Sequence, residues 1–355
     1  MRLRDYVVRR LLLLIPVLVG VSIITFALTR SVAGPYGPAS IYIDERCSAS
    51  DACINAIIHR YGFDQPIPVQ YLRYMQGLLS GDLGYSRSAQ TTVSQAIVEK
   101  FPATFELASV SMILAVLVGI PLGVISATRR DKPVDHATRT FALAGVSLPI
   151  FWLALMLKIV FYDKVDWIDG NPLLPVTGRY DTTLNMYCLE GCVVTPVTNL
   201  YTVDAILAGN GVALIDAIKH LALPAITLSY VTMALITRMM RSSMLEVLNQ
   251  EYIKTARSKG LSEKVVVRKH ARRNALIPTT TVIGLAFGGL LGGAVLTETV
   301  FDWPGLGQWS ATAIVRLDSA AVMGFTLLSA VIYVLANLVV DLLYAYLDPR
   351  IRLGE

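Results

Sequence analysis

The sequence predicts an all-α membrane protein with six transmembrane helices. Of its 355 residues, 54% are hydrophobic and only 16% are charged, whereas a soluble domain carries about 25% charged residues. The apolar residues gather in six stretches, each long enough for a helix to cross the hydrocarbon core of a bilayer. None shows the period-two alternation of a porin strand, and a single segment satisfies its own backbone groups in lipid only as a helix. This composition excludes a disordered chain, a collagen-like repeat and a small disulfide scaffold.

Charge asymmetry predicts how the six spans are oriented. The spans are Leu11–Leu28, Leu107–Thr128, Thr140–Tyr162, Leu221–Met239, Ile277–Leu296 and Ala321–Leu347. An even number of spans places both termini on one side of the membrane. Most of the 31 Lys and Arg residues lie in the N-terminus, the turn after the second span, residues 238–273 and the C-terminal tail. Basic residues favour the cytoplasmic side, so the net charge of +5 indicates cytoplasmic termini rather than binding to nucleic acid.

The first span has a second interpretation as a cleaved signal peptide. Arginines precede it, and Ser31-Val32-Ala33 after it resembles a cleavage site. Its apolar run is longer than the roughly 7–15 residues of a typical signal-peptide core. We therefore predict a retained N-terminal segment at residues 1–29, with a short cytoplasmic end and the first span.

The polar segments between spans divide the rest of the chain. Residues 30–102 form a predicted extracytoplasmic segment, the outer cap, and residues 103–355 form the permeation core with the other five spans. Within the core, residues 163–220 form a second outer segment, and residues 240–276 form a cytoplasmic loop, the coupling loop. Gly and Pro punctuate the outer cap, which indicates ordered turns.

All four cysteines lie in these two outer segments, at Cys47, Cys53, Cys188 and Cys192. An extracytoplasmic location permits disulfides, and four cysteines allow three pairings. Short separations favour Cys47–Cys53 and Cys188–Cys192. The alternative is a metal site with four thiolate ligands, but the spacing does not follow a standard zinc pattern, so we expect no metal.

The chain lacks the motifs that would give it an activity of its own. It contains no Gly-Lys dipeptide and hence no Walker A loop, no H-E-x-x-H and no G-x-S-x-G. We therefore expect no catalytic residue and no cofactor bound by this chain, and a membrane-embedded enzyme is disfavoured. An ion-coupled secondary transporter is the alternative, with Lys158 and Asp341 as its candidates. Both lie close enough to a membrane interface to be snorkelling residues.

The coupling loop has the pattern of a helix, a stop and a second helix. Good helix formers run from Met244 to Lys259, and Gly260 favours the left-handed stop at a helix C-terminus. Ser262 is placed to cap a second helix, which leads toward the fifth span with Pro278 in its first turn.

The first of these helices is interpreted as a docking knob. Tyr252, Ala256 and Lys259 lie near one face of it, and the small Ala256 would permit close approach of a partner. The alternative is a solvated basic loop that only sets topology.

Sequence motifs in this loop resemble a known signature. Glu251–Leu261 reads Glu-Tyr-Ile-Lys-Thr-Ala-Arg-Ser-Lys-Gly-Leu, and Arg273–Pro278 reads Arg-Asn-Ala-Leu-Ile-Pro. Together they resemble the coupling loop of ABC-importer permeases, in the form used by the dipeptide/oligopeptide family. Further motifs that resemble this family are Arg9–Pro16, Tyr61–Pro66, Gly81–Ser86, Phe101–Leu107, Gly119–Gly123, Ser147–Trp152, Leu296–Gly307 and Asp341–Arg350.

The resemblance implies a type I ABC importer permease fold in a prokaryotic cell membrane. It implies a homologous second permease subunit, two ABC ATPase subunits that bind ATP and Mg²⁺, and an extracytoplasmic substrate-binding protein. The implied cargo is a dipeptide or oligopeptide, with oligosaccharides or metal chelates as the alternative.

The resemblance also assigns site residues. It implies contact with an ATPase for Glu251, Tyr252, Thr255, Ala256, Arg257, Gly260 and Leu261, supported by Arg273, Asn274 and Pro278. Gly284, Gly288 and Gly292 recur every four residues and predict either close helix packing or a lining of the substrate path. Just beyond the fifth span, Glu298, Asp302 and Trp303 are candidates to contact substrate or the binding protein.

Overall fold

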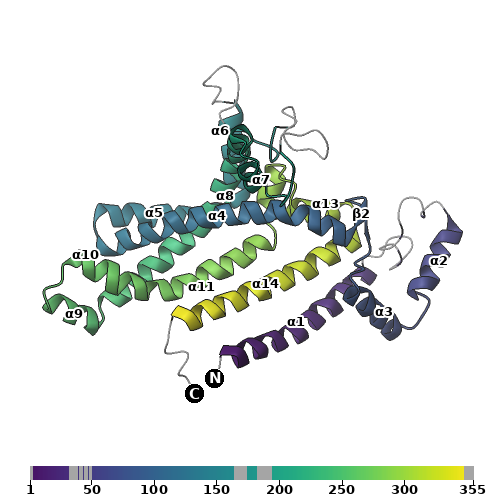
Figure 1. Cartoon of the computed structure of the whole chain (residues 1–355), viewed down its shortest axis with the longest axis horizontal. Helices are drawn as coiled ribbons and strands as arrows, with labels where there is room; N and C mark the ends of the chain where they lie inside the picture. The colour runs from purple at the N-terminus through teal and green to yellow at the C-terminus, as the bar shows by residue number, and fades with distance from the viewer. Residues whose placement is uncertain are drawn as a thin grey trace.

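A computed structural model describes residues 3–31, 39, 43, 47, 50–163, 174–181 and 194–347. Long helices dominate it, and several of them run along its longest axis (Figure 1). In chain order the elements are α1 (Leu3–Ser31), α2 (Asp51–Tyr61), α3 (Ile67–Leu79), β1 (Tyr85–Ser86), β2 (Thr91–Thr92), α4 (Val93–Thr128), α5 (Pro133–Ser147), α6 (Ile150–Asp163), α7 (Tyr201–Leu207), α8 (Gly211–Leu248), α9 (Glu251–Ser258), α10 (Glu263–Val265), the π-helix η4 (Val266–Ala271), α11 (Arg272–Leu291), α12 (Val295–Val300), α13 (Leu306–Val315) and α14 (Ser319–Leu347).

The described chain contains four helices that are long and apolar enough to cross a membrane. They are α4, α8, the continuous run Glu263–Leu291 and the described part of α14, Ser319–Val340. The α5–α6 pair would be a fifth span if it crosses as one bent unit. The predicted first span lies in α1, where the described side chains include a shorter apolar stretch, Ile15–Ala27. The count of six spans therefore stays a prediction, while the helical membrane fold is confirmed, with the short β1–β2 hairpin as an addition.

The predicted third span is not one continuous helix. The chain bends by 102° between α5 and α6, at Leu148 and Pro149. Leu148 is extended, with φ −79° and ψ 129°, because the ring of a following proline disfavours helical geometry at the preceding residue. Proline itself suits the start of the next helix. The predicted span over Thr140–Tyr162 is therefore divided between two helices that meet at this bend.

The predicted fifth span also ends earlier than expected. Helix α11 ends at Leu291, and Gly293 has a φ of +112° that breaks the helix before α12 begins at Val295. Glycine adopts this backbone conformation without the steric penalty of a side chain. Residues 292–296 thus belong to a turn and a new short helix rather than to the span.

Helices α4 and α8 make the most extensive helix contact in the described chain. Buried apolar residues form this contact along its whole length, among them Leu107 and Leu228 near one end and Ala127 and Met240 near the other. Added to Gly123, a Cβ would lie 2.6 Å from the Cβ of Met240, so a glycine allows the two backbones to approach. Helices α5, α6 and α11 pack on this pair, while α14 packs mainly on α11 and α1 packs on α14.

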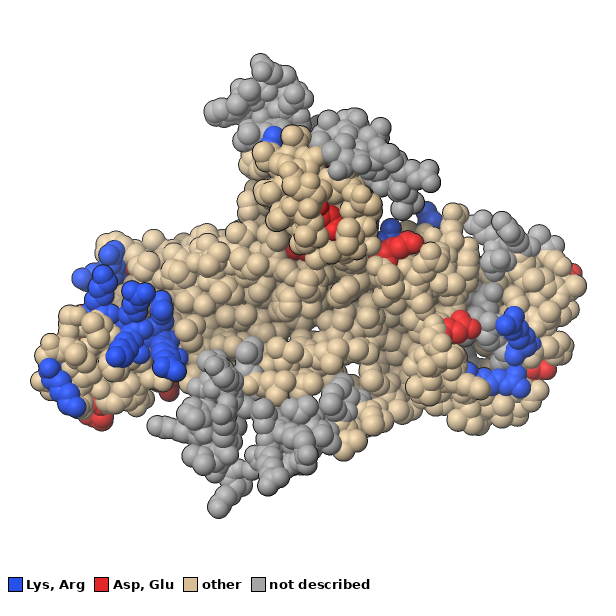
Figure 2. Space-filling model, viewed as in Figure 1, with Lys and Arg blue, Asp and Glu red and all other residues tan. Residues whose placement is uncertain are grey.

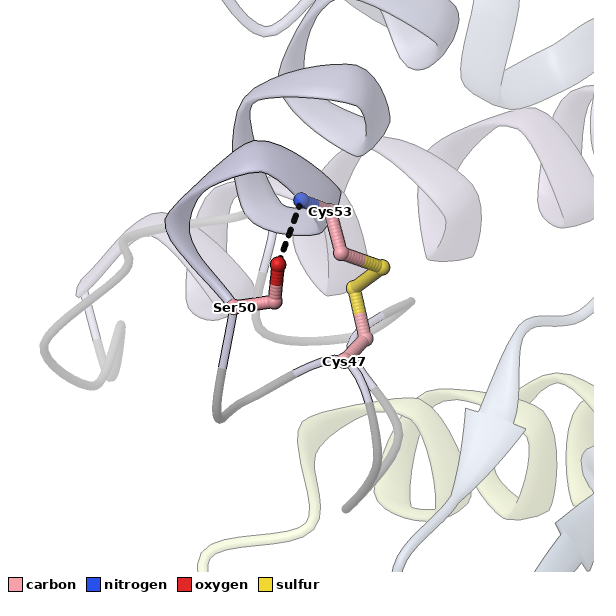
Figure 3. The surroundings of a disulfide bond; sticks show 3 residues. All are labelled: Cys47, Ser50 and Cys53. Carbon is pink, nitrogen blue, oxygen red and sulfur yellow. Dashed lines mark hydrogen bonds between the residues drawn. A yellow bond between two sulfur atoms is a disulfide. The ribbon is translucent and has the colours of Figure 1, made fainter.

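The predicted outer cap contains α2, α3 and the β1–β2 hairpin. Cys47 and Cys53 form a disulfide, as predicted, and Ser50 caps α2 by accepting a 3.4 Å hydrogen bond from the Cys53 amide (Figure 3). Cys188 and Cys192 lie outside the described residues. The predicted boundary at residue 102 falls inside α4, so the cap and the core share one continuous helix.

Candidate functional site: the coupling loop

The short helix α9 lies at one end of the long axis, beyond α8 and before α10 (Figure 1). Lys and Arg gather at this end of the molecule in the view of Figure 2. The predicted helix over Met244–Lys259 is in fact two helices, because α8 ends at Leu248 and α9 begins at Glu251. The break turns the chain, so that α9 forms a separate element rather than an extension of α8.

One face of α9 is buried against its own chain. Ile253 is fully buried and Ala256 is 7% exposed, and both pack in a cluster with Met240 and Met244 of α8 and Val266 of η4. The interpretation of Ala256 as a docking surface therefore needs correction. Its small side chain permits close packing of α9 on α8 and η4, and does not face a partner.

The opposite face of α9 and the turn after it are exposed. This surface includes Tyr252, which is 44% exposed, and Leu261, which is 40% exposed. We call it the α9 outer face; its exposed members are Glu251, Tyr252, Lys254, Thr255, Arg257, Ser258, Lys259, Gly260 and Leu261. It combines apolar and charged groups, as protein interfaces do.

Polar contacts hold this face in place. The Asn274 side-chain amide donates a 2.9 Å hydrogen bond to the Tyr252 hydroxyl, which ties α9 to α11. Arg257 donates two hydrogen bonds to Glu263, at 3.0 and 2.7 Å, across the turn at Gly260. The pairing with Glu263 raises the pKa of the Arg257 guanidinium, so its charge is retained. Arg273, a predicted support, is exposed.

Gly260 ends the α9 turn as predicted. It has φ +77°, and its amide donates to the Arg257 carbonyl at 2.9 Å. No heavy atom of the chain lies within 4 Å of where a Cβ would stand. The glycine is therefore needed for backbone conformation, not for space within this chain.

The second helix of the loop differs from the prediction in two ways. Ser262 occupies the N-cap position of α10, but its side chain makes no capping hydrogen bond. The chain then forms η4 and α11 without interruption, so Pro278 lies inside α11 rather than in a first turn. A π-helix is rare and often occurs at functional sites.

Two of the three glycines predicted at the fifth span form a packing surface. A Cβ on Gly284 would clash with Val340, and one on Gly288 would lie 2.6 Å from the Cβ of Ala336, both on α14. A Cβ on Gly292 would meet only ordinary contacts, 3.4 Å or more away. The geometry thus supports close packing of α11 on α14 at Gly284 and Gly288.

Glu298, Asp302 and Trp303 do not form one surface. Glu298 is fully buried, and its carboxylate accepts hydrogen bonds from the Thr104 hydroxyl at 2.8 Å and from the backbone amide of Gln308 at 3.0 Å. Trp303 is 1% exposed and donates to the Ala103 carbonyl at 2.9 Å. Both join the α12–α13 region to α4, so the prediction of outside contacts needs correction for these two; Asp302 alone is exposed.

Two buried ion pairs were missed by reading the sequence. The Arg241 guanidinium of α8 donates to both carboxylate oxygens of Asp135 at 2.8 Å, and Asp135 is fully buried. Arg179 donates to Glu106 at 2.5 Å, and the Thr202 hydroxyl donates to the same carboxylate at 2.7 Å. In the sequence, Asp135 and Glu106 stand out only as acidic residues among basic or apolar neighbours. The sequence does not show which arginine pairs with each, because Arg241 and Arg179 are distant along the chain.

No cluster in the described residues suggests chemistry. Within them, no group of three or more His, Cys, Asp or Glu side chains is placed to hold a metal ion. Lys158, a candidate for ion coupling, donates a 2.8 Å hydrogen bond to the Val300 carbonyl and joins α6 to α12. The Asp341 side chain lies outside the described residues.

Two family models match nearly the whole chain. Residues 119–353 match the family described as "Binding-protein-dependent transport system inner membrane component", and residues 3–108 match its N-terminal component. The chain belongs to this family. It is a multi-pass membrane permease rather than an enzyme, and the coupling loop described above lies within the matched core.

Several permeases named for peptide transport are similar to this chain over nearly their full length. A probable D,D-dipeptide transport system permease of Escherichia coli K12 is 46% identical over 96% of this chain and 95% of its own. A dipeptide transport system permease of Alkalihalophilus pseudofirmus is 43% identical, over 98% and 99%. An oligopeptide transport system permease of Bacillus subtilis is 36% identical, over 98% and 99%.

Proposed function

We propose that this permease forms, with a homologous second permease, the membrane path of an ATP-driven importer of dipeptides and oligopeptides. Relatives named for dipeptide and oligopeptide transport support this cargo class over oligosaccharides and metal chelates. The absence of a Walker A loop in the sequence means that ATP acts elsewhere. Two ABC ATPase subunits supply its energy, and an extracytoplasmic binding protein delivers the peptide.

The observation that carries the proposal is the two-faced packing of α9. Its inner face is buried against α8 and η4, while the α9 outer face is open to a partner. A force applied to the outer face would therefore move α8 and α11 with it instead of bending a loose loop. Closure of the ATPase pair on ATP binding would in this way bias the helices between outward-open and inward-open arrangements.

The orientation follows from this assignment. The coupling loop and both termini lie in the cytoplasm, and the outer cap with its Cys47–Cys53 disulfide lies outside, where thiols oxidise. The second outer segment, joined to α4 by the Glu106–Arg179 pair, lies on the same side as the cap. No ion gradient is needed in this scheme.

Replacement of Leu261 by aspartate tests the proposal. Leu261 is 40% exposed, so the variant should fold. If Leu261 is covered by an ATPase subunit, the new carboxylate would lose its hydration in that contact, and uptake of a labelled dipeptide should fall by about tenfold or more. Leu79→Asp, an 83% exposed leucine at the end of α3, is the matched control and should transport normally.

Two results would contradict the proposal. One is normal ATPase association and uptake by Leu261→Asp. The other is transport by the purified permease alone, in liposomes with an ion gradient and no ATPase, which would indicate a secondary transporter.

A further inference from the structure

A groove beside the coupling end of the bundle contains arginines that the proposed function does not use. It is a cavity of about 340 Å³ between α4, α5 and α8, lined by Arg139, Arg238 and Arg241. The charge of Arg241 is matched by Asp135. Arg139 and Arg238 form no ion pair with any residue that the structure describes. Among the described residues, then, no acidic side chain pairs with two of the three positive charges in the groove.

Beyond Arg139 the α5 side of the groove carries apolar residues, and the remaining lining residues are small and hydroxyl-bearing: Ser126, Thr138, Ser147, Thr237 and Ser242. The apolar residues are Ala142, Leu143 and Val146, and Leu143 is 61% and Val146 46% exposed. A small anion would use the arginines but leave these side chains uncovered. The lining therefore matches an amphipathic occupant, with an anionic group beside the arginines and an apolar chain along α5.

The two arginines line the same groove, each near a boundary of the apolar part of its helix. In α5 Arg139 and Thr140 precede the apolar run that begins at Phe141, and Arg238 lies at the end of the apolar part of α8. Arginines at such boundaries place their charges at the level of lipid headgroups. Phospholipid is the amphipathic anion available at that depth.

We propose that this groove binds one anionic phospholipid, with its phosphate between Arg139 and Arg238 and an acyl chain against Leu143 and Val146. The assignment to the cytoplasmic leaflet rests on the orientation in the proposed function. The guanidinium groups would donate charge-assisted hydrogen bonds to the phosphate oxygens. A lipid in this position would hold α5 against α8 next to the Asp135–Arg241 pair, which supports the helix leading into α9.

The test measures lipid retained by the assembled transporter. After equilibration in vesicles of equal phosphatidylglycerol and phosphatidylcholine, native mass spectrometry counts the phosphatidylglycerol bound per complex. The double variant Arg139→Gln/Arg238→Gln should bind it roughly tenfold more weakly than wild type, because two headgroup contacts are lost. Arg129→Gln/Arg130→Gln removes the same charge outside the groove and should retain wild-type binding.

Three outcomes would overturn the proposal. Equal retention by both double variants would place the lipid elsewhere. Loss of the second permease from the Arg139→Gln/Arg238→Gln complex, with unchanged lipid on the complexes that remain, would make the groove a subunit contact. Displacement of phosphatidylglycerol from the wild type by excess inorganic phosphate would indicate a site for free anions, and this arm needs no variant. Peptide uptake by the wild type is a separate measurement, and its failure alone would contradict the proposed function.

Discussion

Neighbouring residues in α9 have opposite environments. Ala256 is buried among residues of α8 and η4, while Arg257 points outward and pairs with Glu263. On a helix, residues one position apart face different directions, so not every residue of this motif can contact the same partner. The signature Glu251–Leu261 therefore combines two roles: residues that fix α9 to its own chain and residues that are free to meet a partner.

Gly260 offers a test of the turn that ends α9. Because its φ is +77°, Gly260→Ala should lower the free energy of unfolding by about 1–2 kcal/mol, although no atom lies within 4 Å of the new methyl group. Thermal unfolding of the purified permease measures the change.

Gly211→Ala is the control for Gly260→Ala. Gly211 also has open space around its Cβ position but lacks the positive φ, so its replacement should leave stability unchanged or slightly improved. An equal loss in both variants would show that backbone conformation at Gly260 is not the cause.

At the scale of helices, close packing joins the coupling loop to the rest of the bundle. Helix α11 follows η4 without a break and packs on α14 through Gly284 and Gly288. A displacement of the loop would therefore be transmitted along α11 to α14. The same tight packing makes this helix pair sensitive to added volume.

Gly288→Leu tests the packing of α11 on α14. A Cβ at Gly288 would lie 2.6 Å from that of Ala336, so the larger side chain should cost about 1–3 kcal/mol and separate the two helices. Ala336→Gly in the same chain should recover part of the loss. Gly289→Leu, one residue further where no atom lies within 4 Å, should be tolerated, and unfolding of the three variants in detergent measures the difference.

The helices could be predicted from the sequence because apolar length is a local property. The bend at Pro149 also had a local signal, yet a proline in an apolar run equally permits a kinked but continuous helix. The roles of Ala256, Glu298 and Trp303 could not be predicted in the same way. Their burial depends on side chains from other helices, and spacing along one segment does not show which neighbours will cover it.

At the scale of the whole molecule, the two ends of the bundle are built differently. One end carries α9 with its basic surroundings, and the other carries α2 and α3 with the Cys47–Cys53 disulfide (Figures 1 and 2). Helix α4 runs from the β1–β2 hairpin toward the coupling end, and α8 runs from α7 to α9; both are more than 35 residues long. Such long, continuous helices suit a device that couples events on opposite sides of a membrane.

Cross-linking in the assembled transporter tests the central claim, that α9 is the contact through which ATPase closure moves the permease. A photoreactive benzoyl-phenylalanine replaces Lys259 on the α9 outer face, and in a second protein it replaces the exposed Glu99 of α4. Illumination should join position 259 to an ATPase subunit and should give no such adduct from position 99. Absence of an ATPase adduct at position 259, in a complex that still transports peptide, would contradict the account.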